Sequence, residues 1–179
     1  MRMKTRLVGL LVLFSTFAAF NLSGAFEVIL SKETPVQVCF SPQGGCTDGI
    51  VKTIDRARSE ILVQAYSLAS MSIHRALLRA HERGVKIALI ADKSERAEGL
   101  TPIAILASAG IPVYLDGQHA VANNRVIIVD QQFVITGSFN FNQASEEMNA
   151  ENLLTLDSRE LAAEYRKNWH RHRQHSEPY

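Results

Sequence analysis

The sequence predicts an α/β fold, with a mostly parallel or mixed sheet that carries helices on both faces. Short apolar stretches alternate along the chain with longer stretches whose apolar residues recur at helical spacing. The strand-like stretches, such as "ILVQAYS" and "VKIALIAD", are almost continuously apolar, which indicates burial on both sides of a sheet. No low-complexity or linker-like segment interrupts the alternation, so a single domain is expected.

Each element is predicted by its own pattern. The strand 36–40 leads into a turn rich in Pro and Gly, and Thr47 is placed to cap the helix that follows. Gly84 and Gly110 end the next two helices. In chain order the expected elements are strand 36–40, helix 47–57, strand 61–67, helix 71–84, strand 85–92, helix 101–110, strand 111–115, strands 125–130 and 133–138, helix 143–148, strand 152–156 and helix 158–172.

The first 25 residues have the pattern of a secretory signal peptide. A basic start is followed by an apolar run over 7–20, and Ser23 and Ala25 are small residues of the kind that a signal peptidase reads. An uncleaved membrane anchor is the alternative, but the run is shorter than the roughly 20 residues that span a bilayer. We therefore expect a signal peptide over 1–25, a single domain over 26–179, and a bacterial protein exported to the periplasm or secreted.

Charge and cysteine content limit the function classes. After cleavage at Ala25 the chain would carry sixteen basic and eighteen acidic residues. A nucleic-acid binder that uses a broad positive face would be more basic, so any recognition of phosphate must be local. Cys39 and Cys46 flank a segment rich in turn formers, and in an oxidising compartment a disulfide between them is plausible. In the cytosol two unpaired thiols would be preferred.

The stretch "VANNRVIIVDQQFVITGSFNFN" concentrates polar groups at the ends of two strands. Asp130 ends a buried strand, where a carboxylate needs a partner, and Ser138 and Asn140 supply a hydroxyl and an amide beside Gly137. In folds of alternating strands and helices, ligands collect at strand ends. Taken alone, these residues could equally close a strand and cap the next helix.

From Asn123 the order is N-x-R-(x4)-D-(x6)-G-S-x-N. This order resembles the H-x-K-(x4)-D-(x6)-G-S signature of the phospholipase D superfamily, with Asn123 at the His position and Arg125 at the Lys position. Stretches such as "HRALLRAHERGVKIALIADKS" extend the resemblance over about residues 35–179. The chain is most similar to the small, exported branch with one motif per chain that is related to the bacterial Nuc-type endonuclease.

The resemblance implies a phosphodiesterase of nuclease or phospholipase type that works as a homodimer, with two motifs facing each other around a shared site. One His attacks phosphorus and forms a phosphohistidine, the His of the other chain protonates the leaving oxygen, and water completes hydrolysis without a metal or other cofactor. The implied ligand is a phosphodiester, of DNA, RNA or phospholipid. The family's catalytic positions fall on Asn123, Arg125, Asp130 and Glu151, and its phosphate-binding positions fall on Arg125, Ser138 and Asn140.

The departure at Asn123 removes the group on which this chemistry depends. A neutral imidazole attacks a phosphodiester anion effectively, whereas a carboxamide is barely nucleophilic and does not titrate in the working range. Arg125 keeps the positive charge but has a different donor geometry from Lys. His119 is the candidate stand-in, but we expect it to have a loop or rim role.

Three further histidines lie close together near the C-terminus. His170, His172 and His175 lie near the end of the last expected helix, where i and i+2 side chains diverge, so an exposed basic terminus is expected and no metal site. We predict a phospholipase D-type fold whose own activity is impaired by Asn123. The alternatives are a non-catalytic protein that binds a phosphodiester and a dimerisation partner of an active relative.

Overall fold

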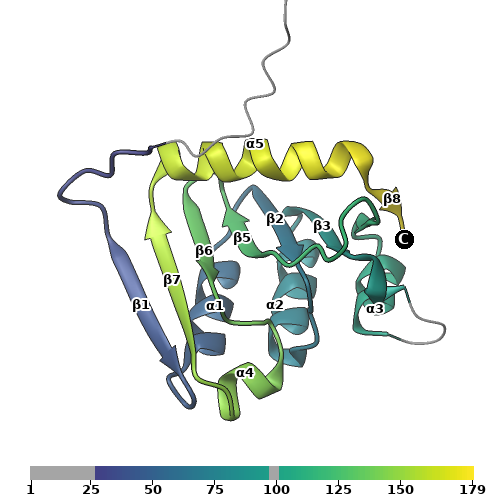
Figure 1. Cartoon of the computed structure of the whole chain (residues 1–179), viewed down its shortest axis with the longest axis horizontal. Helices are drawn as coiled ribbons and strands as arrows, with labels where there is room; N and C mark the ends of the chain where they lie inside the picture. The colour runs from purple at the N-terminus through teal and green to yellow at the C-terminus, as the bar shows by residue number, and fades with distance from the viewer. Residues whose placement is uncertain (1–26, 97–100) are drawn as a thin grey trace, which may run out of the picture.

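The computed structural model describes residues 27–96 and 101–179 (Figure 1). The predicted signal peptide over 1–25 lies outside the described residues. Within the described part, no helix is both long enough and apolar enough to cross a membrane.

One eight-stranded sheet organises the described residues, in the order β1-β7-β6-β5-β2-β3-β4-β8. Only the pairs β2–β3 and β3–β4 are parallel, and the other neighbours are antiparallel. The sheet is therefore mixed: a short turn joins β5 to β6, and the longer segment 138–150, which contains α4, joins β6 to its antiparallel neighbour β7. The strands are β1 (Val36–Ser41), β2 (Glu60–Ala65), β3 (Lys86–Asp92), β4 (Val113–Asp116), β5 (Arg125–Val129), β6 (Phe133–Gly137), β7 (Glu151–Asp157) and β8 (Glu177–Pro178).

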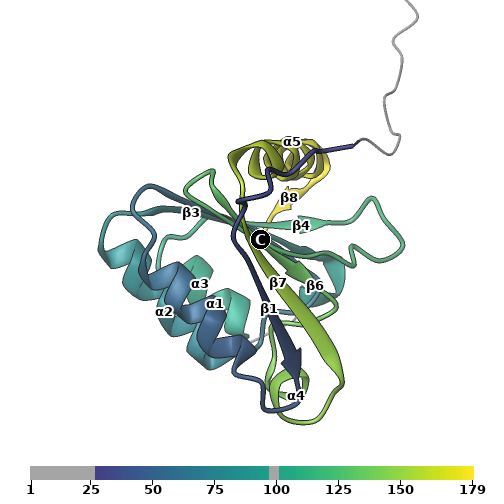
Figure 2. The same cartoon turned by 90° about the vertical axis from the view of Figure 1, so that its left-hand side faces the viewer.

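Helices cover both faces of the sheet, as the sequence predicts. Figure 2 shows α1, α2 and α3 together on one side and α5 on the other. Alternate side chains of β2 point to opposite faces: Val63 belongs to the larger core under α1–α3, and Leu62 packs with Trp169 of α5. The helices are α1 (Cys46–Asp55), α2 (Met71–Glu82), α3 (Pro102–Ser108), α4 (Gln143–Glu147) and α5 (Arg159–His175).

The start of α1 differs from the expected one. Its N-cap is Gly45, in a left-handed conformation, rather than Thr47. Glycine has no side chain, so the cap residue itself cannot accept from the first N–H groups of the helix. The carboxylate of Glu146, from α4, instead accepts bonds from the backbone N–H groups of Gly45 (2.9 Å) and Thr47 (2.7 Å). Cys39 and Cys46 form the disulfide that the sequence made plausible, which ties β1 to α1.

The strands share one end that matters for function. At this end β1, β2, β3, β4 and β6 finish, and β5 and β7 begin, as the registers Ser41↔Glu151, Ala65↔Arg125 and Asp92↔Asp116 show. We call it the motif end of the sheet, because the polar residues of the sequence motif lie there.

Candidate functional site

Three neighbouring strands bring the motif residues together at the motif end. Arg125 is the first residue of β5, Gly137 is the last residue of β6, and Glu151 is the first residue of β7. Because β5–β6 and β6–β7 are antiparallel neighbours, residues more than twenty positions apart in the sequence meet at one end. Four of the predicted site residues, Arg125, Ser138, Asn140 and Glu151, are joined there in two hydrogen-bonded groups.

The first group holds the guanidinium of Arg125. Its Nε donates to Oδ1 of Asn140 (2.7 Å), and its Nη1 donates to the backbone carbonyl of Asn123 (3.3 Å). The cap of α4 is Asn142, whose side chain accepts from the N–H of Ser145, so Asn140 is not needed for capping. Asn140 is therefore a positioning group for the cation, and the remaining N–H groups of Arg125 can bind an anion in a forked geometry.

The second group is centred on Ser138. The Ser138 hydroxyl donates to Oε2 of Glu151 (2.6 Å) and accepts from the backbone N–H of Asn152 (3.1 Å). The other oxygen of Glu151 accepts from Nδ2 of Asn149 (3.3 Å). A hydroxyl on the exposed surface is thus fixed in direction, and it can exchange Glu151 for a phosphate oxygen by rotation about one bond.

Gly137 is required for this arrangement by close approach of the backbone. A Cβ added there would lie far inside van der Waals contact with the carbonyl of Asn152. The same carbonyl accepts from the N–H groups of Ser138 (3.1 Å) and Phe139 (3.3 Å). Gly137 therefore allows the end of β6 to approach β7 closely, with Ser138 at the surface. Phe139, the next residue, is fully buried and fixes the turn.

Asn123 lies beside the first group, the one that holds Arg125. It lies in the loop between β4 and β5, two residues before Arg125, and its side chain is exposed to solvent. The neighbouring backbone is held in place: the carbonyl of Asn124 accepts from the N–H of Tyr66 (2.8 Å), and the N–H of Ala122 donates to Asp92 (2.7 Å). A fixed backbone thus presents an amide side chain where the motif has an imidazole.

Asp130, also among the predicted site residues, does not lie with the other four. It lies at the opposite end of β5, in the turn to β6, with a positive φ of 53°. Its carboxylate accepts from the backbone N–H groups of Arg58, Ser59 and Glu60 and from the hydroxyl of Ser59. Burial alone would raise the pKa of Asp130, but these bonds lower it below the ordinary value. Its role is to fix the turn before β2.

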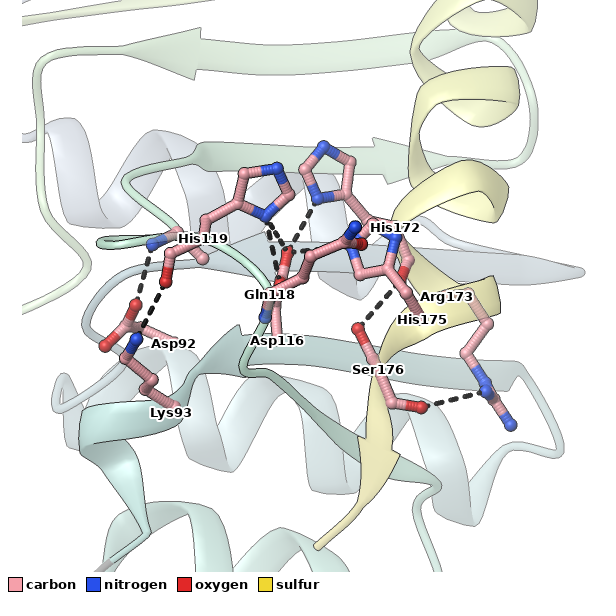
Figure 3. A network of polar contacts seen from close by, with 10 residues as sticks. Asp92, Lys93, Asp116, Gln118, His119, His172, Arg173, His175 and Ser176 are labelled. Atoms are coloured by element: carbon pink, nitrogen blue, oxygen red, sulfur yellow. Dashed lines mark hydrogen bonds and ion pairs between the residues drawn. The ribbon is translucent and has the colours of Figure 1, made fainter.

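His119 does not face the motif residues. Its Nδ1 lies 3.0 Å from the carboxylate of Asp116, at the end of β4, and His172 and His175 of α5 converge on the same carboxylate (Figure 3). Burial favours a raised pKa for Asp116, but the hydrogen bonds from the three imidazoles outweigh it and keep the pKa well below the ordinary value. We call Asp116, His119, His172 and His175 the histidine cluster.

The histidine cluster was not predicted from the sequence as a unit. The usable signal was the i, i+3 spacing of His172 and His175, which puts both on one face of a helix, combined with Asp116 and His119 three residues apart. What the sequence could not show is that α5 ends beside the loop after β4. His170, in contrast, is exposed and packs edge-on against Trp169.

Comparisons with known proteins agree with this arrangement. A family profile described as "Cardiolipin synthase, PLD-like domain" matches residues 50–173. Phospholipase D of Rickettsia felis is 41% identical over 150 residues, which cover 84% of this chain and 72% of the relative. Mitochondrial cardiolipin hydrolase of Xenopus tropicalis is 30% identical over 123 residues, which cover 69% of this chain and 59% of the relative.

Solved structures show the same fold. Nuc from Salmonella typhimurium, described as a phospholipase D family member, has a TM-score of 0.74 at 33% identity, over 82% of this chain and 99% of Nuc. NucT from Helicobacter pylori has a TM-score of 0.75 at 22% identity, over 82% of this chain and 100% of NucT, and supports the fold alone. The mixed sheet, the motif residues gathered at its end and these matches together establish that this chain belongs to the phospholipase D superfamily, as a Nuc-like member with one PLD-like domain.

Proposed function

We propose that this protein binds a phosphodiester at the motif end of the sheet and hydrolyses it poorly, because Asn123 replaces the nucleophile. The observation that supports the proposal is the pair of hydrogen-bonded groups around Arg125 and Ser138 beside an exposed Asn123. A cation and an oriented hydroxyl can hold the phosphate oxygens, and they resemble the groups that stabilise charge in a phosphoryl transition state. The nucleophile is the missing part.

The proposed complex is a homodimer that pairs two motif ends. In the hydrolysis implied by the family resemblance, one chain supplies the nucleophile and the other supplies the acid, so both motifs must meet. Support comes from large apolar side chains exposed around this end, next to the strand ends and helix starts: Phe40, Tyr66, Met71, Val121 and Met148. Large apolar side chains exposed together in one region of a surface are typical of a protein–protein interaction site.

Sedimentation of the purified protein tests the dimer. Met148→Glu places a charge among the exposed apolar side chains of the motif end and should shift the mass from dimer to monomer. Ile29→Glu is the matched control, because Ile29 is also an exposed apolar residue but precedes β1 near the opposite end of the sheet. A wild-type protein that sediments as a monomer at micromolar concentration would contradict the proposed assembly.

Restoring the nucleophile tests the function. The wild-type protein should show little or no turnover of a chromogenic phosphodiester without added metal, and Asn123→His should raise kcat/KM by about a hundredfold or more, since loss of a nucleophile costs several orders of magnitude. Asn124→His is the control, because it adds an imidazole one residue away from the motif position. A folded, dimeric Asn123→His protein that stays inert would refute a preserved site, and robust wild-type turnover would refute the impairment.

Direct binding separates the possible ligands. Fluorescence anisotropy with a short single-stranded oligonucleotide and co-sedimentation with phosphatidylglycerol vesicles measure the two sources of phosphodiester. Arg125→Ala should weaken whichever binding is observed, while Arg159→Ala, at the opposite end of the sheet, should leave it unchanged. Absence of binding to both probes would favour the role of partner to an active relative.

A further inference from the structure

The histidine cluster draws four metal-binding side chains from two distant segments to one point. Asp116 ends β4 and His119 lies in the loop that follows, while His172 and His175 lie in the last turn of α5. One ligand atom from each of the four lies within 4.8 Å of every other. Figure 3 shows the three imidazole rings gathered around the carboxylate of Asp116.

The carboxylate of Asp116 is the centre of the histidine cluster. Oδ2 of Asp116 lies 2.7 Å from Nδ1 of His172, 3.0 Å from Nδ1 of His119 and 3.3 Å from Nε2 of His175. Nδ1 of His119 is equally close to Oδ1 (3.0 Å), so the three rings and the N–H of Gln118 together use the roughly four lone-pair positions of the carboxylate. Three imidazoles gathered around one buried carboxylate, with ligand atoms within 4.8 Å of one another, form a compact donor set that can share one central ion.

We propose that Asp116, His119, His172 and His175 form a binding site for one divalent transition-metal ion of the zinc class. Three imidazoles and one carboxylate match the ligand preferences of Zn²⁺, and they do not match Mg²⁺ or Ca²⁺, which prefer oxygen ligands throughout. With neutral imidazoles the ligand set carries one negative charge, which suits a dication. This proposal departs from the expectation of no metal, which rested on His170 and His172 diverging.

The cluster must rearrange by about an ångström to accept the ion. Tetrahedral ligands at about 2.0–2.1 Å from zinc lie roughly 3.3–3.4 Å apart, so the nitrogen nearest Asp116 must move away from the carboxylate while ligand atoms that are up to 4.8 Å apart must approach one another. Asp116 is fully buried at the bottom of the site, and the His119 side chain is 44% exposed, which leaves a path for the ion from solvent. Four protein ligands and a buried base are typical of a structural metal site.

Neighbouring groups hold the ligands in place, as is usual around metal sites. The other carboxylate oxygen of Asp116 accepts from the N–H of Gln118 (3.1 Å), and the carbonyl of His119 accepts from Nζ of Lys93 (2.8 Å). The carbonyl of His172 accepts from the hydroxyl of Ser176 (2.8 Å). The backbone around each of these ligands is thus anchored independently of the ion.

The ion would join two parts of the molecule that are far apart in the sequence. It would fasten the end of α5 to the loop between β4 and β5, and this loop runs along the motif end from His119 to Asn123. The proposed site is separate from the phosphodiester site, and the proposal stands whether or not the protein hydrolyses a phosphodiester.

Calorimetric titration of the untagged, metal-free full chain with Zn²⁺ tests the site. We expect one ion per chain, with a dissociation constant in the micromolar range or tighter, and an increase in the melting temperature that EDTA reverses. Mg²⁺ should produce neither effect. With Co²⁺ in place of Zn²⁺, intense visible absorption bands should appear, which report four-coordinate nitrogen and oxygen ligation.

Variants locate the binding. His119→Ala and His175→Ala should each weaken Zn²⁺ binding at least tenfold, and His170→Ala, an exposed histidine on the same helix, should bind as the wild type does. Because His119 is exposed on a loop, its removal keeps the fold even if a helix variant fails to fold. Absence of saturable binding up to millimolar Zn²⁺, or binding that survives His119→Ala and His175→Ala, would overturn the proposal.

Discussion

At position 123 the proposed function depends on one side chain. Arg125 and Ser138, the proposed phosphate-binding groups, bond to the side chains of Asn140 and Glu151, and Arg125 contacts Asn123 only through its backbone carbonyl. An amide there can donate a hydrogen bond to a phosphate oxygen, but it cannot form a covalent bond to phosphorus and later release it. Under the proposed function, the difference from the family motif at position 123 therefore removes the bond-making group and leaves the proposed binding groups in place.

At Asp130 the carboxylate serves the fold, and its removal should affect stability. Asp130→Asn keeps the shape and the preference for positive φ but weakens the bonds to the backbone around Ser59, so we expect a loss of about 1–2 kcal/mol in the free energy of unfolding. Urea unfolding at pH 7 measures it.

The pH dependence of the stability difference between wild type and Asp130→Asn shows how much of it comes from the negative charge of Asp130. Because the folded pKa of Asp130 is lowered, its stabilisation is fully present above the unfolded pKa of about 3.9 and is lost as the pH falls through the folded pKa. The gap between wild type and Asp130→Asn should therefore shrink below about pH 4. A gap that is constant from pH 7 to pH 3 would show that the charge contributes nothing.

At the scale of elements, α4 caps α1 through a side chain. The Glu146 carboxylate replaces the missing cap of α1 and lies at the positive end of the helix. Burial would raise the pKa of Glu146, but the bonds from Thr47 and its neighbours lower it, which shows that the ionised form is favoured. This contact links the segment after the motif to the helix that follows the disulfide.

Glu146→Gln should therefore cost about 0.5–2 kcal/mol, the range for loss of a helix cap. Glu147→Gln is the matched control, because Glu147 is exposed on the same helix and bonds only to Gln143 among the described residues. Chemical denaturation of both variants gives the comparison. Equal losses in the two would mean that Glu146 acts as an ordinary surface charge.

The order of helices and strands was predictable from the sequence, whereas the pairing of the strands was not. Helical spacing and apolar runs predicted α1–α5 and β1–β7 in order, because these patterns reflect burial of each element separately. They could not show that β5, β6 and β7 run antiparallel, since strand direction depends on which neighbours pair. For this reason Asp130 was grouped with Ser138, although a hairpin sends them to opposite ends of the sheet. The cap from Glu146 and the short strand β8 arise from tertiary contacts alone.

The same limit separates the site residues that the sequence predicted from the histidine cluster that it did not. The family resemblance predicted Arg125, Ser138, Asn140 and Glu151 as site residues, and the structure places all four at the motif end because β5, β6 and β7 are antiparallel neighbours. The histidine cluster was missed because His119 and His175 meet only after α5 has crossed the sheet. The sequence alone does not show where α5 ends relative to β4, so only the three-dimensional structure reveals the cluster.

At the scale of the whole molecule, α5 is the one helix on its face of the sheet among the residues that the structure describes. It either unfolds together with the rest or separates from the sheet first. Leu62 and Val63 are consecutive in β2, yet they belong to the two different cores, so each core depends on the same strands. Trp169, the single tryptophan, is buried in the core under α5 and donates to the carbonyl of Val63 (2.9 Å). Its fluorescence therefore reports the docking of α5, while far-UV circular dichroism reports all the helices and strands.

We expect the two signals to follow one transition in urea, because strands shared between two cores make unfolding cooperative. Leu161→Ala removes a partly buried contact to the core under α5, and it should lower both midpoints together. Arg171→Ala, exposed on the same helix, should move neither. If fluorescence changed before circular dichroism, and Leu161→Ala widened the interval, α5 would be a separately unfolding layer. A metal at the histidine cluster would then be expected to close that interval, because it fastens the end of α5 to the loop after β4.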